Sequence, residues 1–228
     1  MSKIFDMDSP LFRGLSKLAD IMILNIIFII CCIPIVTIGA SVTAMSYVTL
    51  KMKDGEEGYI FRTFFKSFKQ NFKQATIIWL LLLFLAVFMV VDFLIIGSME
   101  GTMAMTMKVL VGMGGLILLM VFIYVFPLQA RFYNSIKATI QNAILLSIAN
   151  FPKTFCMMAV MIAAVLVTLI NGYTLWYGLL VWILVGFALI SWINSHFIYG
   201  IFKKLMPPEE EENETAEEEM SLDTEKMP

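Results

Sequence analysis

The chain has 228 residues, of which 60% are hydrophobic and only 15% are charged. This composition is typical of an integral membrane protein and excludes an ordinary soluble globular domain. The formal net charge of −2 hides a division: residues 1–206 carry 15 Lys/Arg against 8 Asp/Glu, whereas residues 207–228 carry 1 Lys against 10 Asp/Glu. We therefore predict a single basic membrane domain, 1–206, followed by a disordered acidic tail, 207–228.

The first apolar stretch, residues 21–50, contains 30 residues without a charge. As one helix it would be about 45 Å long, against about 30 Å of hydrocarbon in a bilayer. Pro34 divides it, because proline breaks or kinks a helix. We predict two short crossings, about 13–33 and 38–53. One tilted, kinked crossing is the alternative.

Residues 51–74 form the longest charged run of the membrane domain. A helix over 59–74 would place aromatic residues on one face and basic residues beside them: Phe61, Phe64, Phe65, Phe68 and Phe72, flanked by Arg62, Lys66, Lys69 and Lys73. Such a face suits a helix lying on an anionic membrane surface. It equally suits an aromatic stripe packed against the protein's own bundle, and the sequence leaves both interpretations open.

Four further crossings follow, at about 74–96, 109–126, 154–170 and 174–200, with a second amphipathic helix at about 135–150. The predicted fold class is an all-α, polytopic membrane protein with about six crossings, five being possible, and two cytoplasmic amphipathic connector helices. Asp92 is the one charge in the third crossing. An intramembrane acid suggests an ion pathway, but Gly97 and Glu100 follow closely, which favours a position at the outer interface.

The distribution of Lys/Arg predicts the orientation. With six crossings, 15 of the 16 basic residues fall on one side and Lys108 alone on the other. The positive-inside rule then places both termini in the cytoplasm. Five crossings would export Lys3, Arg13 and Lys17, so the count favours six.

The chemistry-bearing residues point to no enzyme. The three cysteines, Cys31, Cys32 and Cys156, lie in apolar runs without metal-ligand spacing, and we expect no metal, cofactor or catalytic site. One connection between the two connectors is conceivable: Glu56 or Glu57 could pair with Arg131 on the same side of the membrane. The alternative is that all three are solvated and independent.

Several short stretches, taken in order, resemble the YesL family, domain of unknown function family 624, whose members are small polytopic membrane proteins found mostly in Gram-positive bacteria. They are DSPLF at 8–12, LAD at 18–20, IPIVTIGAS at 33–41, EEGY at 56–59 with the Phe/Lys run to 75, FPLQARF at 126–132 and NFPK at 150–153. The resemblance implies a bacterial plasma-membrane protein whose genes neighbour sugar-uptake ABC transporters and their sensors. It carries over no activity, ligand or catalytic residue.

Two functions are therefore expected from different classes. The first is an accessory or regulatory protein associated with carbohydrate uptake or sensing, whose partners are the bilayer and a sugar ABC transporter or a membrane sensor kinase, with no nucleic acid. The alternative is a small-substrate transporter or substrate-capture subunit. The predicted crossings lack the buried charged pairs that usually mark transport sites.

Overall fold

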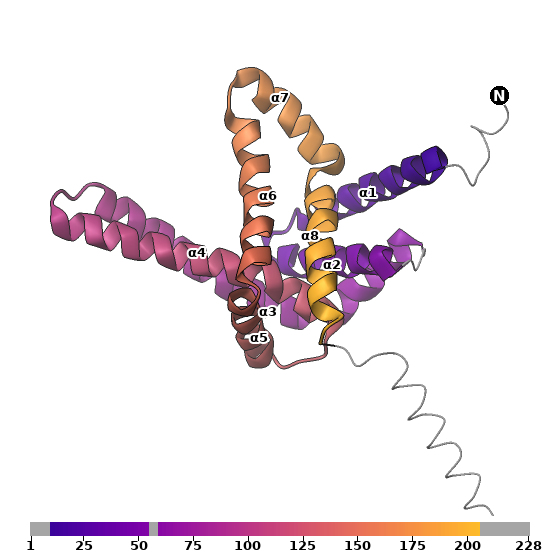
Figure 1. Cartoon of the computed structure of the whole chain (residues 1–228), viewed down its shortest axis with the longest axis horizontal. Coiled ribbons are helices and arrows are strands. Elements are labelled where there is room, and N and C mark those ends of the chain that lie inside the picture. Colours follow the sequence, from indigo (N-terminus) through magenta and orange to yellow (C-terminus); the bar gives the residue numbers. More distant parts are fainter. Residues whose placement is uncertain (1–9, 55–58, 206–228) are drawn as a thin grey trace, which may run out of the picture.

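The structure is a computed structural model that describes residues 10–54 and 59–205. Within these ranges every element is helical, and Figure 1 shows their course. In chain order they are α1 (Pro10–Cys32), the short 3-10 turn η2 (Ile35–Thr37), α2 (Ile38–Asp54), α3 (Ile60–Gly97), α4 (Thr102–Arg131), α5 (Ile136–Ala149), α6 (Phe151–Leu169), α7 (Gly172–Val181), the π-helical turn η3 (Trp182–Gly186) and α8 (Phe187–Phe202). The predicted acidic tail lies outside the described residues.

Six helical segments of the described ranges are long and apolar enough to cross a membrane, which confirms the predicted polytopic all-α fold. The stretch that contains Pro34 forms two helices, α1 and α2, rather than one kinked crossing. A side chain of α3 holds the turn between them, because the Trp79 Nε1 donates a hydrogen bond to the Ile35 carbonyl at 2.8 Å. The last crossing consists of α7, η3 and α8 in one run, Gly172–Phe202.

The first amphipathic connector is not a separate helix. It is the N-terminal part of α3, which continues without interruption for 38 residues, about 57 Å. The sequence contains neither glycine nor proline between 60 and 96, so nothing stops the helix where the charged segment meets the apolar one. A continuous helix cannot both lie flat on a membrane and cross it. The second connector, α5, is separate, and Ser135 caps it by accepting a hydrogen bond from the Ala138 amide at 3.3 Å.

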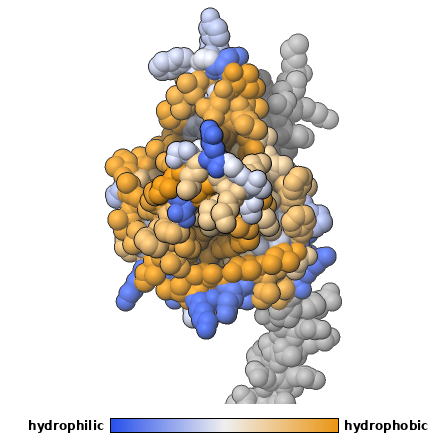
Figure 2. Space-filling model, turned by 90° about the vertical axis from the view of Figure 1, so that its left-hand side faces the viewer, coloured by the Kyte–Doolittle hydropathy of each residue, from blue (hydrophilic) through white to orange (hydrophobic). Residues whose placement is uncertain are grey.

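The helix α2 lies at the centre of the fold. It packs against α1, α3, α4 and α8. In its most apolar stretch of 18 residues, 56% is buried inside the protein, against 6% in the corresponding stretch of α3. Two hairpins project from this core in different directions: α3 with α4 to the left and α6 with α7 upward in Figure 1. Figure 2 shows apolar side chains over most of the face toward which α3 and α4 project, with hydrophilic ones at its centre, at its top and along its lower edge. The hairpins therefore present hydrocarbon-compatible surface, as lipid-exposed helices must.

Candidate functional site

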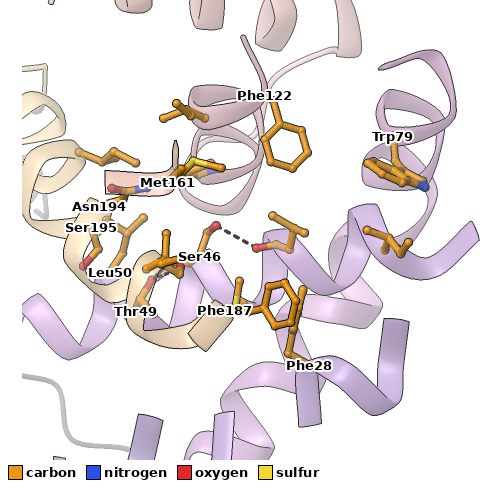
Figure 3. Close-up of a pocket in the computed structure, with 18 of the residues that line it drawn as sticks. Phe28, Ser46, Thr49, Leu50, Trp79, Phe122, Met161, Phe187, Asn194 and Ser195 are labelled. Atoms are coloured by element: carbon orange, nitrogen blue, oxygen red, sulfur yellow. Dashed lines mark hydrogen bonds between the residues drawn. The ribbon is translucent and has the colours of Figure 1, made fainter. Parts of the chain in front are cut away.

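A cavity of about 420 Å³ lies within the core, and Figure 3 shows 18 of its lining residues. Its walls come from α2, α4, α6 and α8, with single residues contributed by α1, α3 and η3. Aromatic side chains form much of the wall: Phe28, Trp79, Phe122, Trp182 and Phe187. Its volume falls within the range of small-molecule sites, about 300–1,000 Å³.

A strip of small polar residues interrupts the apolar wall on α2 and α8: Ser46, Thr49, Ser191, Asn194 and Ser195. The hydroxyl groups of the four Ser and Thr residues are already hydrogen-bonded within the protein. Ser46 donates to the Val42 carbonyl at 2.8 Å and Ser195 to the Trp192 carbonyl at 2.7 Å, while Thr49 and Ser191 join their hydroxyls at 3.2 Å.

Asn194 differs from its neighbours in the strip. It is only 7% exposed, and among the described residues its Oδ1 has no hydrogen-bond partner. A buried amide oxygen without a partner is uncommon and costs free energy. The Asn194 oxygen itself is fully buried against the protein, so it is not open to an occupant of the cavity.

The π-helical turn η3 shapes the cavity wall, because Trp182 is its first residue and Phe187 follows its last. A π-turn disturbs the regular backbone hydrogen bonds of a helix. Asn25, fully buried on α1, compensates: its Nδ2 donates to the Trp182 and Ile183 carbonyls at 3.0 and 2.7 Å, and its Oδ1 accepts from the Ala188 amide at 2.9 Å. One amide thus fixes the distorted segment against α1.

Two lining residues of the cavity, Val165 on α6 and Phe187 at the start of α8, are 46% and 40% exposed. Both belong to the apolar runs of the fifth and sixth crossings, so this part of the wall also forms part of the apolar outer surface.

A second buried polar cluster joins the two predicted connectors. The Gln129 Nε2 on α4 donates to the Asn71 Oδ1 at 3.2 Å and to the Gln74 Oε1 at 2.7 Å, both on α3. Its Oε1 accepts from the Thr139 hydroxyl of α5 at 3.4 Å. Gln129, Asn71 and Thr139 are buried, so this amide network holds the charged end of α3 and the helix α5 in a fixed arrangement.

The aromatic stripe divides between core and surface. Phe64 is fully buried, and Phe65 and Phe68 are partly buried and pack against the core, whereas Phe61 and Phe72 are 63% and 39% exposed. The four flanking basic residues are all exposed: Arg62, Lys66, Lys69 and Lys73. The centre of the stripe thus packs on the bundle while both ends and the basic flanks remain on the surface. Direct contact with lipid headgroups stays a prediction.

The other predicted residues lie apart from the cavity. Glu56 and Glu57 are outside the described residues, so their pairing with Arg131, in the last turn of α4, stays a prediction. Asp92 is partly exposed near the far end of α3. Among the described residues no three His, Cys, Asp or Glu side chains gather where they could hold a metal ion.

The sequence reasoning missed the cavity, Asn25 and Asn194. A signal for the two residues was present, because each amide stands inside an otherwise apolar crossing, where polar side chains are expensive and usually have a role. Their partners could not be foreseen. Asn25 bonds residues more than 150 positions away in the chain, and Asn194 is notable only because no described partner reaches its oxygen.

The helical fold and its six apolar segments define a multi-pass α-helical membrane protein. Residues 21–93 match the family model described as "Protein of unknown function, DUF624", which confirms the family resemblance predicted from the sequence. This segment includes the central helix α2 and most of α3, whereas α4, α6 and α8 of the cavity lie beyond it. No curated protein and no solved structure matches the chain.

Proposed function

We propose that this protein is a non-enzymatic accessory or regulatory component of carbohydrate uptake or sensing in a bacterial plasma membrane, that of a Gram-positive organism. Both termini lie in the cytoplasm, together with the charged start of α3 and the helix α5. The distribution of Lys/Arg supports this orientation. The resemblance described above, with its implied gene neighbours, supports the link to sugar uptake.

The observation that carries the proposal is a basic surface held rigidly by the Gln129 network. On α3 this surface displays exposed Arg62, Lys66, Lys69 and Lys73, and on α5 exposed Lys137. Because Gln129 bonds both helices, it joins the two parts of this surface through buried hydrogen bonds. A pre-organised surface loses less conformational entropy when a partner protein binds, which favours docking.

The chemistry of the cavity also favours an accessory role over direct binding of sugar. A sugar carries several hydroxyl groups, each of which needs a partner when buried. Ser46 and Ser195 already donate their hydroxyl protons within the protein, so the strip offers a ligand acceptors but few donors. The rest of the wall is apolar, so a sugar in this cavity would bury several hydroxyl groups without partners.

A small-substrate transporter or substrate-capture subunit is the second candidate, and the existence of a cavity of about 420 Å³ favours it. The two candidates predict different behaviour of the purified protein. A substrate-binding subunit is stabilised on its own by its sugar, because a ligand that binds only the folded state raises its stability. An accessory protein gains stability from its protein partner instead.

The test is copurification from native membranes. We expect a sugar ABC transporter or a membrane sensor kinase to copurify with the wild-type chain. Lys66→Gln with Lys69→Gln should weaken this association, whereas Lys203→Gln with Lys204→Gln removes the same charge from another exposed site and should not. Absence of both partners, together with stabilisation of the isolated protein by a sugar, would replace the accessory role with substrate capture.

A further inference from the structure

The basic residues around the start of α3 have few acidic neighbours in the sequence. No acidic residue occurs between Glu57 and Asp92, or between Glu100 and Glu209. These two stretches nevertheless contain ten of the 16 Lys/Arg, four in the first and six in the second. With six crossings, nine of the ten fall on one side of the membrane and Lys108 alone on the other. A surface with this excess of positive charge attracts an anionic partner.

One face at the start of α3 displays four of these cations. Ser67 and Asn71 are buried on the opposite side of the helix, and the exposed face carries Arg62, Lys66, Lys69 and Lys73. Arg62 precedes Ile77, at the start of the apolar run, by 15 residues, about 22 Å of helix. The headgroup layer on each side of a bilayer is only about 5–8 Å thick. Most of this face therefore extends beyond the headgroups, where it meets water-soluble groups rather than lipid.

The end of α8 lies close to this face. The rings of Phe202 in α8 and Phe132 after α4 have centroids 5.2 Å apart. Gln129, three residues before Phe132, bonds Asn71 of α3 at 3.2 Å. Packed helices lie about 8–10 Å apart, and a helix with its side chains is about 10–12 Å wide. Two such spacings and one helix width give a path of about 30 Å from the end of α8 to the exposed face of α3.

The residues that follow α8 supply the negative charge that this face lacks. Residues 207–228 carry 10 Asp/Glu against 1 Lys. An extended chain covers at most about 3.5 Å per residue. Glu209 follows Leu205 by four residues, about 14 Å, and reaches only the cations near the end of α8. Glu217 follows Leu205 by 12 residues, about 42 Å, and reaches the exposed face of α3.

We propose that the acidic tail occupies the basic face of α3 in the same molecule, with Glu217–Glu219 docked against Lys66, Lys69 and Lys73. Exposed ion pairs are individually weak, but the tether gives the tail a millimolar effective concentration at this face. The contact requires only the charges of this chain and does not depend on the proposed accessory role. It covers the surface on which a partner protein would dock, so tail and partner exclude each other.

The experiment measures the distance between two spin labels by double electron–electron resonance, on the full chain in phosphatidylcholine nanodiscs with one chain per disc. The labels are placed at Gln70→Cys, an exposed position on α3, and at Ser221→Cys, two residues after the docking cluster, once the three native cysteines are replaced. We expect a narrow short-distance component from the docked tail. It should disappear when the salt is raised from 0.1 to 1 M, because the Debye length then falls from about 10 to about 3 Å.

Removal of charge from the face should weaken the docking. Lys66→Gln with Lys69→Gln should lower the ratio of docked to undocked tail about fivefold, as expected for the loss of two exposed ion pairs of ordinary strength. Lys17→Gln with Lys108→Gln is the matched control: it removes the same charge from exposed residues away from this face and should leave the ratio unchanged.

An exchange of charges provides a test that a folding defect cannot imitate. Glu217→Lys, Glu218→Lys and Glu219→Lys together should abolish the docked component, and Lys66→Glu with Lys69→Glu in the same chain should restore it. Absence of the component in the wild type, or failure of the exchange to restore it, would overturn the proposal. So would a component that is lost when phosphatidylglycerol is added to the disc, because the face would then belong to anionic headgroups.

Discussion

Replacing Asn25 by leucine tests how the distorted helix η3 is held against α1. The side chain is fully buried and makes three hydrogen bonds, at 3.0, 2.7 and 2.9 Å, to backbone groups around η3. Leucine fills a similar space but leaves these groups without the amide. Each buried polar group that loses its partner costs about 1–3 kcal/mol. Because the backbone can relax toward a regular α-helix, we take the lower end, about 3 kcal/mol for the three groups together.

For a protein of this size, this loss corresponds to a decrease in Tm of about 6–12 °C. The measurement is thermal unfolding of the detergent-solubilised protein, followed by circular dichroism or by tryptophan fluorescence. Asn142→Leu on α5 is the matched control, since its amide is only partly buried and lies on a helix that packs mainly against α4 and α6. A Tm for Asn25→Leu no lower than that of the control would refute the view that this amide stabilises the π-turn.

Three further variants probe the packing, each by the same thermal measurement. Gln129→Leu removes the amide that joins α3 to α5 and should cost about 2–3 kcal/mol; a neutral effect would mean that the network does not fix the basic surface. Gly39→Ala places a methyl group against the Ala75 carbonyl and should cost about 3 kcal/mol, whereas Gly112→Ala, with open space around it, should be neutral or stabilising. Tyr124→Phe removes a buried hydroxyl bonded to α6 at 2.9 Å and should cost about 1 kcal/mol, and a larger loss would indicate a role beyond this bond.

The local sequence was sufficient to predict the six segments that are long and apolar enough to cross a membrane. Pro34 interrupts a run that is too long for one crossing, and the structure confirms two helices there. Apolar length alone identified the other four crossings, because a membrane demands about 20 apolar residues with internally satisfied backbone.

The sequence was less informative about where helices end, for example where an amphipathic segment meets an apolar one. The change from amphipathic to apolar character near Gln74 suggested a boundary, yet α3 passes through it because no residue there disfavours a helix. The fourth crossing was predicted to end at about residue 126, but α4 continues through Pro127 to Arg131. A proline removes one backbone donor, and a buried, well-packed helix end tolerates this loss.

The candidate site could not be predicted, because it depends on tertiary contacts. The cavity forms where α2, α4, α6 and α8 meet, and these helices are far apart in the chain. Likewise, the link between the predicted connectors was sought in charged residues, whereas the described structure joins them through Gln129. Local patterns identify which residues are polar, but only the fold determines which of them meet.

All of these proposals rest on six crossings with the basic helix ends on one side of the membrane. The direct measurement is maleimide labelling of single-cysteine variants in intact cells, after replacement of Cys31, Cys32 and Cys156. Ser98 and Ser135 are suitable positions because both are exposed in the structure. We predict that an impermeant maleimide labels Ser98→Cys in intact cells, and Ser135→Cys only after the membrane is opened. Labelling of Ser135→Cys from outside would contradict the topology, and with it the cytoplasmic docking surface.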